Sequence, residues 1–194
     1  PMGLQYSITA IGSVILQTAV NGLGSVVVAS MTAGGKLSMF FCCPFDAFGS
    51  TMATYAGQNL GAGKLDRVTK GMVQCSFVAA GYSVVAAVVM ILFGKSFALL
   101  FVDSTEAEII ANVAKLLIIN SLFFIPLALV NIIRFAIQGL GFGKLAIFAG
   151  VAEMVGRSIV GFGFVARFGF VAACLASPIA WILADIFLIP AYAY

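Results

Sequence analysis

Histidine is absent from the 194 residues, and charged residues of either sign make up only 9% of the chain. Without histidine, neither a His-Glu-x-x-His zinc site nor a serine–histidine relay can form. An ordinary soluble domain has about 25% charged residues, which keep its surface wetted. With 62% hydrophobic residues, this chain lacks the charge to cover even a compact globule in water. The composition therefore predicts an integral membrane protein.

Sparse charge and few cysteines exclude further classes of protein. The net charge of +3 is too small and too dispersed for a nucleic-acid surface, so no nucleic acid partner is expected. The four cysteines lie inside apolar runs, and adjacent Cys42 and Cys43 suit neither a disulfide staple nor a metal clip. We therefore expect no metal, no bound cofactor and no enzymatic activity. The chain starts at Pro1 within apolar sequence and shows no signal-peptide pattern, so we expect a fragment of a longer chain.

Long uncharged runs predict membrane-spanning helices, each of which needs about 20 mostly apolar residues. No charge occurs before Lys36, and the run 21–24 is the clearest turn within that stretch. Runs such as 84–93 do not alternate in polarity, which excludes β-barrel strands. We expect residues 1–194 to form a single six-helix transmembrane bundle, an all-α membrane protein without a soluble domain. The expected helices cover about residues 4–22, 27–56, 70–93, 107–138, 145–166 and 170–191.

Prolines and hydroxyl side chains predict where these helices bend and begin. Pro44 should tilt or kink the second helix, and Pro126 should bend the fourth. Ser104 or Thr105 is expected to cap the fourth helix, with Glu108 nearby.

Lysine and arginine in the short loops predict the orientation of the bundle. More of them lie on the side with Lys64, Arg67, Lys70 and Lys144 than on the side with Lys95 and Arg167. Six passes place both ends of this piece on the first side, so we expect both ends to be cytoplasmic.

The stretch GQNLGAGKLDR, residues 57–67, has the glycine and lysine content of a phosphate-binding loop. A Walker A loop needs glycine at the position of Gln58 and a hydroxyl side chain at the position of Leu65, so this motif does not match. A dinucleotide-binding fingerprint that starts at position 139 needs glycine at the position of Lys144, so it does not match either. We expect instead a compact cytoplasmic loop that allows close helix approach and meets anionic lipid headgroups. The residues assigned to this loop are Gln58, Asn59, Gly61, Lys64 and Arg67, with Gly57 four residues before Gly61.

Four stretches together resemble the multidrug and toxic compound extrusion (MATE) family. They are NGLG at 21–24, the segment 44–67 containing FGSTMATYAGQNLGAGKLDR, QGLG at 138–141 and EMVGR at 153–157. The similarity covers essentially the whole chain and matches the carboxyl-terminal half of that family, its helices seven to twelve. The resemblance implies one half of a twelve-helix, pseudo-twofold transporter, whose partner would be the amino-terminal six-helix half.

The resemblance also implies an activity and a location. The activity would be antiport of small amphipathic, usually cationic compounds against protons or sodium by alternating access. The location would be the plasma membrane, the inner membrane of a bacterium, as a multi-pass protein. A lipid-linked oligosaccharide flippase of the same wider superfamily and a non-transporting membrane scaffold are the alternatives. A flippase would need a larger, strongly cationic cavity, and few arginines here could line one.

Ionisable residues inside the expected spans cost about 2.5–3.5 kcal/mol each at a helix centre, so each needs a role. Glu153 and Arg157 are four residues apart and share a helix face, which fits a structural ion pair or a proton relay. Asp46 lies near the middle of the second helix, which fits a proton-binding carboxylate, a side chain facing a water-filled cavity or a cap on a neighbouring helix. We expect Arg134 to snorkel to the headgroups, and Asp185 to reach the interface or pair locally.

Neutral polar residues complete the expected substrate or ion pathway. Gln17, Asn21, Asn120 and Asn131 lie on the first and fourth helices, where they could bond across helices or line a pathway together with Asp46. In part of the family, acidic residues on the matching helices coordinate sodium, but these two helices offer no carboxylate in their middle. We therefore expect coupling to protons, through Asp46 or the amino-terminal half, without sodium dependence.

Overall fold

The computed structural model describes residues 2–193, whose regular structure is entirely helical. No strand occurs in this range, so the expected all-α class is confirmed. Seven α-helices and one short π-helical segment, η1, follow one another along the chain. Their bounds are α1 Met2–Asn21, α2 Ser25–Gly61, α3 Leu65–Ala98, α4 Ala107–Leu122, α5 Phe124–Gly139, α6 Gly143–Ile159, η1 Val160–Phe164 and α7 Val165–Ala193.

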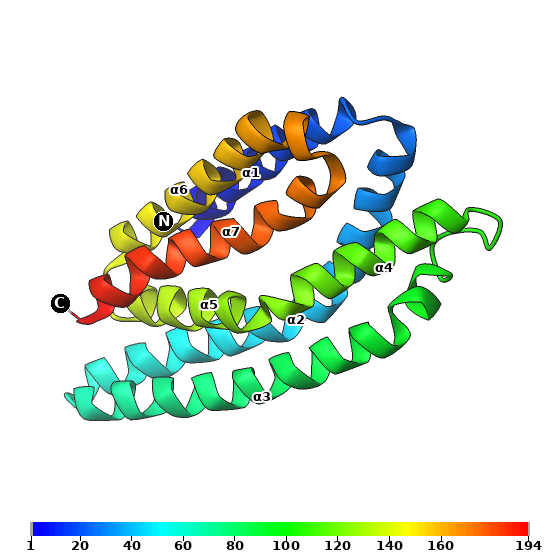
Figure 1. The fold of residues 1–194 in the computed structure, drawn as a ribbon. Helices are drawn as coiled ribbons and strands as arrows, with labels where there is room; N and C mark the ends of the chain where they lie inside the picture. Colours follow the sequence, from blue (N-terminus) through cyan, green and yellow to red (C-terminus); the bar gives the residue numbers. More distant parts are fainter. Residues whose placement is uncertain (1, 194) are drawn as a thin grey trace.

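The helical segments run back and forth between the two ends of the molecule (Figure 1). Taking α4 and α5 as one broken helix, and dividing the last stretch at Gly169, gives six passes. Gly169 has φ 61° and ψ −138°, a conformation that glycine alone adopts without strain, so the chain turns back at this residue.

Within residues 2–193, three helical stretches are long and apolar enough to cross a membrane, and the bent pair makes a fourth. These stretches are Ser25–Gly61, Leu65–Ala98, Gly143–Tyr192, and Ala107–Leu122 together with Phe124–Gly139. The third of them spans 50 residues because it contains two passes joined at Gly169.

The expected bend in the helix over 107–138 takes the form of a break, because the chain turns by 54° between α4 and α5. The break lies at Phe123, about one turn before Pro126. Proline has no N–H to donate to the carbonyl four residues earlier, that of Leu122, and its ring crowds this carbonyl. The Phe123 N–H donates to Asn120 O at 3.0 Å, a tighter turn than an α-helix makes. Pro126 therefore does bend this pass, and the bend falls on its N-terminal side.

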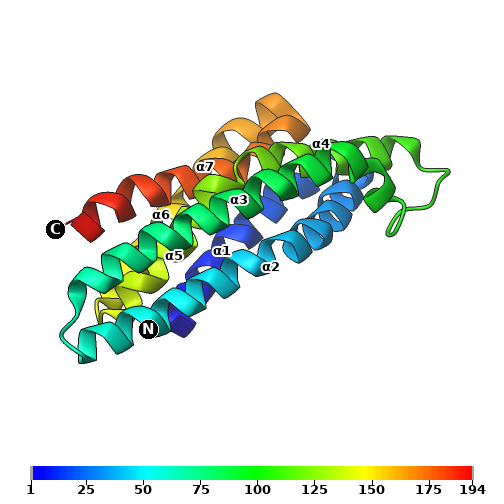
Figure 2. The ribbon, with the colours of Figure 1, turned by 90° about the horizontal axis from the view of Figure 1, so that it is seen from below.

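Helix α2 continues through Pro44 and changes direction along its length (Figure 1). Pro44 removes the N–H donor for Phe40 O, and the Tyr82 hydroxyl of α3 donates to the neighbouring carbonyl, Phe41 O, at 2.9 Å. Figure 2 shows α2 and α3 running side by side, and this hydrogen bond ties them together near the proline.

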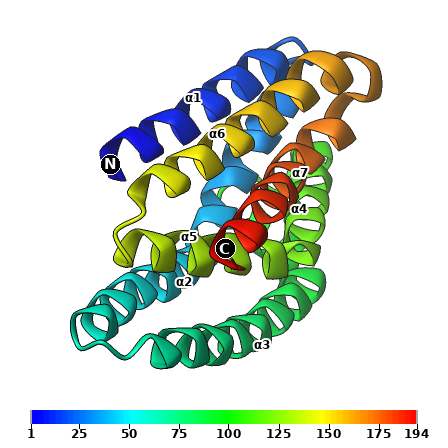
Figure 3. The ribbon, with the colours of Figure 1, turned by 90° about the vertical axis from the view of Figure 1, so that its left-hand side faces the viewer.

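Helix α5 is the most enclosed helix of the bundle. Every residue from Asn131 to Ile137 is buried. Figure 3, an end-on view, shows α5 between α2 and α3 on one side and α6 and α7 on the other. The main apolar core joins α5 to these helices and to α4, while a smaller cluster joins α1, η1 and α7. A polar side chain in this part of α5 therefore lies inside the protein.

Both ends of the described chain lie at the same end of the bundle as the α2–α3 and α5–α6 turns (Figure 1). Gly63 has φ 70° and stops α2, and the Lys64 N–H donates back to Asn59 O at 2.8 Å. The same pattern stops α5 at Gly141, whose φ is 93°. Gly63 and Gly141, two of the glycines that suggested nucleotide-binding loops, therefore serve as helix caps.

The expected capping of α4 by Ser104 or Thr105 is wrong. Glu106 precedes α4 and forms no side-chain cap bond. The Thr105 N–H and hydroxyl both donate to Asp103 Oδ1, at 3.1 Å each, which forms a local Asx turn. These bonds, the backbone one above all, hold the pKa of Asp103 below its usual value.

Candidate functional site

A group of ion-paired side chains lies buried between α1, α5 and α6. Glu153 of α6 is 3% exposed and contacts two arginines. Arg134 of α5 binds Glu153 Oε1, and Arg157 Nη2 lies 3.4 Å from Glu153 Oε2. Arg157 Nη1 also donates to Thr9 O of α1 at 3.5 Å. Glu153 therefore connects its own helix to α5 directly and to α1 through Arg157.

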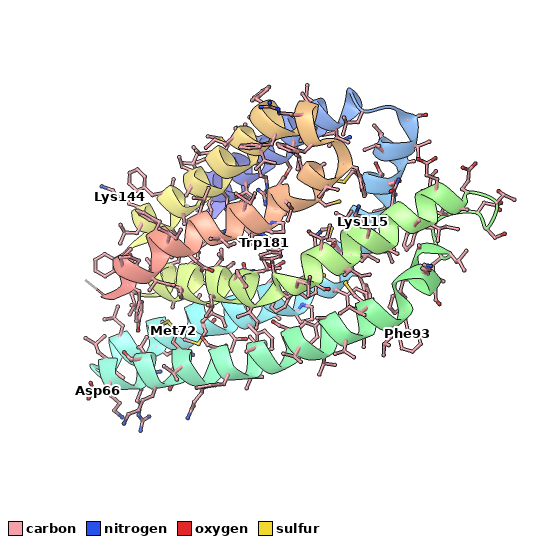
Figure 4. The ribbon with its side chains drawn as sticks, viewed as in Figure 1. Asp66, Met72, Phe93, Lys115, Lys144 and Trp181 are labelled. Carbon is pink, nitrogen blue, oxygen red and sulfur yellow. The ribbon has the colours of Figure 1, made fainter. Side chains whose placement is uncertain are left out.

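A polar cavity of about 170 Å³ adjoins these ion pairs. Trp181 of α7 lies between α7 and α5 (Figure 4) and forms part of the cavity wall. Since each water occupies about 30 Å³ of the liquid, the space suits a few waters, an ion or one functional group, and is smaller than a drug-sized pocket. The other polar side chains in its lining are Gln5, Tyr6, Thr9, Asp46, Asn131, Arg134, Glu153 and Arg157.

Two of the expected pathway residues, Asp46 and Asn131, meet at this cavity. Asp46 is exposed and lies within electrostatic range of Arg134. Asn131 is buried, and its Nδ2 donates to Leu127 O, one turn earlier in α5, at 3.2 Å. The arrangement places an exposed carboxylate at the edge of a buried charged group.

Asp185 of α7 lies within electrostatic range of Arg134, one turn after Trp181. Its side chain is buried, with 8% exposed, so its expected contact with the membrane interface is wrong. Among residues 2–193, no hydrogen-bond partner reaches Asp185 Oδ1, and none reaches Arg134 Nε. A buried polar atom left without a partner costs about 1–3 kcal/mol. A carboxylate and a guanidinium therefore lie near each other with unused hydrogen-bonding capacity.

The three other pathway candidates lie away from the cavity. Gln17 Nε2 donates to Asn21 Oδ1 at 2.9 Å, and both side chains are exposed near the end of α1. Asn120 of α4 is buried against α2, where its Nδ2 donates to Ser38 Oγ at 3.2 Å. The structure therefore does not bring these three residues together with Asp46. The Asn120 bond is a contact across helices, one of the two roles that the sequence left open.

Sequence reasoning misplaced Arg134 and missed Gln5. Arg134 is 6% exposed and ion-paired, so the expected snorkelling is wrong, because α5 has no lipid-facing side at this level. Gln5 is buried and accepts a hydrogen bond from Gln138. One signal was available: Asn131, Arg134 and Gln138 lie three and four residues apart and so share one polar face of α5.

The expected cytoplasmic loop joins α2 to α3 at one end of the bundle. Figure 4 marks this end with Asp66, in the first turn of α3, and with Lys144, near the start of α6. Asn59 is half-buried and fastens the last turn of α2, since its Nδ2 donates to Tyr55 O at 2.8 Å. The side chains exposed at the loop are Gln58, Lys64 and Arg67.

One of the two glycines expected to let helices approach closely has no close neighbour. A Cβ on Gly61 would meet no atom within 4 Å, so that expected role is wrong. A Cβ on Gly57 would lie 3.3 Å from Gly139 O. The close approach is thus between α2 and α5, one turn before α2 ends.

Three solved transporter structures share this fold over 97% of this chain and 42% of theirs. A MOP superfamily transporter from Pyrococcus furiosus with a binding pocket of reverse polarity is 17% identical, with a TM-score of 0.84. An outward-facing multidrug resistance MATE family transporter of the MOP superfamily is also 17% identical, with a TM-score of 0.84. MATE in the straight conformation is 18% identical, with a TM-score of 0.83. The chain thus spans about two-fifths of the length of these transporters.

No curated protein matches the chain. The family model MatE matches residues 1–162, out of 194. The chain therefore belongs to the MatE family of multi-pass membrane transporters, the multidrug and toxic compound extrusion family.

Proposed function

We propose that this chain is the carboxyl-terminal half of a secondary active antiporter that exports small amphipathic, cationic compounds in exchange for protons. The observation that carries the proposal is the buried ion-pair group beside a cavity that opens at Asp46. Charged groups in membrane spans are costly and typically mark ion or substrate pathways. The amino-terminal six-helix half of the same transporter would be the partner, and the two bundles would alternate access around a shared cleft.

Asp46 would be the carboxylate that a cationic substrate meets on this half. Replacing Asp46 with Asn keeps the shape of the side chain and removes its charge. A close pair of opposite charges contributes about 1.5 kcal/mol or more to binding, so cation efflux should fall roughly tenfold at unchanged protein abundance. The measurement is efflux of a fluorescent cation in everted vesicles that contain the full-length protein.

Asp66→Asn is the matched control for this experiment, because Asp66 is exposed in the first turn of α3, away from the cavity. Full efflux by Asp46→Asn would refute the assigned role of Asp46. No efflux of any cation by the unaltered protein would favour a scaffold, and transfer of a lipid-linked oligosaccharide would favour the flippase.

We also propose that the α2–α3 and α5–α6 turns face the cytoplasm of the cell, in the plasma membrane. The support is the group of basic residues at that end of the bundle, since lysine and arginine in short loops favour the cytoplasmic side. A cysteine introduced as Asp103→Cys should react with an impermeant thiol reagent added outside intact cells, and Lys64→Cys should not. A cysteine-free background is needed, because Cys43 is exposed. The reverse labelling pattern would invert the orientation.

A further inference from the structure

The charges of the group centred on Arg134 do not balance. Two guanidiniums, those of Arg134 and Arg157, lie near three carboxylates, those of Asp46, Glu153 and Asp185. With all five groups ionised, the group has a net charge of −1. An uncompensated charge in a membrane interior is unfavourable, so the differing surroundings of the three carboxylates decide which of them is neutral.

Two of the carboxylates are accounted for as anions. Glu153 contacts both arginines, one on each carboxylate oxygen. Asp46 is exposed, so it can be solvated as an anion. Both carboxylates therefore have surroundings that stabilise an anion better than those of Asp185 do.

Asp185 has neither the two arginine contacts of Glu153 nor the exposed side chain of Asp46. It is 8% exposed, and among the described residues no donor reaches its Oδ1. Arg134, the cation within range of it, already pairs with Glu153. A buried carboxyl group that is neither solvated nor hydrogen-bonded as an anion is more stable with a proton on it.

We propose that Asp185 is the residue of this half that binds and releases the coupling proton, an assignment that rests on the proposed antiport function. Protonation converts the Asp185 carboxylate to a neutral carboxylic acid. Release of the proton to water that reaches this 8%-exposed side chain restores the anion. The anion then pairs with Arg134, whose Nε has no hydrogen-bond partner among residues 2–193.

The neighbours of Asp185 favour a proton over a metal cation. Arg134 of α5 acts on Asp185, and the other charged and titratable groups around Arg134 are Tyr6 of α1, Asp46 of α2, and Glu153 and Arg157 of α6. Lys115 of α4 lies near Cys174, about three turns away along α7. Within residues 2–193, no three acidic, histidine or cysteine side chains converge as metal ligands would. The described residues therefore offer no set of ligands for a metal cation beside Asp185.

Infrared difference spectroscopy on the purified full-length protein tests the proposal without any transport. The difference between acidic and alkaline buffer should contain a carboxylic acid C=O band that shifts in heavy water. Asp185→Asn should remove this band, whereas Asp66→Asn should leave it in place. A band unchanged in Asp185→Asn would overturn the proposal. So would loss of the band only in Asp46→Asn, since this would place the proton on the exposed carboxylate.

Transport in liposomes separates failure of this proposal from failure of the antiport function. Asp185→Asn should still exchange labelled for unlabelled substrate, more slowly, but should no longer accumulate substrate when a pH gradient is imposed. Asp185→Glu should restore part of the accumulation. Full gradient-driven accumulation by Asp185→Asn would overturn the proton assignment alone. Absence of exchange by the unaltered protein would instead overturn the proposed antiport.

Discussion

Replacing Arg134 with methionine is expected to lower the free energy of unfolding by about 3–5 kcal/mol, which is typical for removing one partner of a buried ion pair. Arg134 and Glu153 are both almost fully buried, so Glu153 would keep its charge with only the more distant Arg157 as its partner. Methionine fills a similar volume, which limits the loss of packing. Unfolding in mixed detergent, together with abundance in membranes, measures the effect.

A double-mutant cycle shows whether the loss of stability in Arg134→Met comes from the uncompensated charge of Glu153. Arg134→Met combined with Glu153→Gln should recover a large part of the stability lost by Arg134→Met alone, because the two effects are coupled. Lys144→Met, which removes an exposed positive charge, should cost little. Simple addition of the two single losses would contradict the ion pair. Normal abundance with lost transport would show that the pair serves proton transfer and is not chiefly structural.

Replacing Gly139 with alanine is expected to destabilise the bundle by about 3 kcal/mol, toward the upper end of what overpacking costs. A Cβ at this position would lie 2.3 Å from Ala53 O and 2.9 Å from Ala53 Cα, both backbone atoms of α2. A flexible side chain could move aside, but a helix backbone cannot, so α2 and α5 would have to separate. The separation would loosen the contact between the helices that contribute Asp46 and Arg134.

Gly81→Ala in α3 is the matched control for this substitution. A Cβ on Gly81 would meet no atom within 4 Å, and alanine favours a helix over glycine by about 1 kcal/mol. The control should therefore hold or raise the melting temperature in detergent, while Gly139→Ala lowers it. Equal stability of the two variants would contradict the close packing of α2 against α5.

Composition and apolar runs were sufficient to predict the class of this fold, because a chain with so little charge has few stable alternatives. Proline chemistry also predicted that the fourth pass would bend. The sequence does not show that the break falls at Phe123, whose N–H donates to Asn120 O in a tighter turn. Likewise, Thr105 bonds to Asp103 and leaves α4 without a side-chain cap.

The candidate site was predictable only where its contacts are local. Glu153 and Arg157 share a face of one helix, so their spacing alone suggested a pair. The contact of Arg134 with Glu153 joins two helices and depends on how α5 is rotated about its own axis. The expectation that Arg134 snorkels to the headgroups assumes a lipid-facing side of the helix. Because α5 is buried on all sides here, this expectation was wrong. For Asp185, burial near Arg134 excludes the expected contact with the interface and leaves the other expected role, a local pairing.

Helix α5 links packing to the proposed function. It contributes Arg134 and Asn131 to the cavity, and its close contact with α2 sets the position of Asp46. The break before Pro126 lies about two turns from Asn131 on the same pass. A change in the tilt of α5 would therefore change the distance between Arg134 and the carboxylates that compete for it.

Gradient-driven uptake by the purified full-length protein in liposomes tests the central claim most directly. With a pH gradient as the sole energy source, and no ATP or sodium, a fluorescent cation should accumulate against its own concentration gradient. An ionophore that collapses the pH gradient should abolish the accumulation. Accumulation that requires a sodium gradient and ignores pH would contradict proton coupling, and no accumulation under either gradient would contradict the assignment as an antiporter.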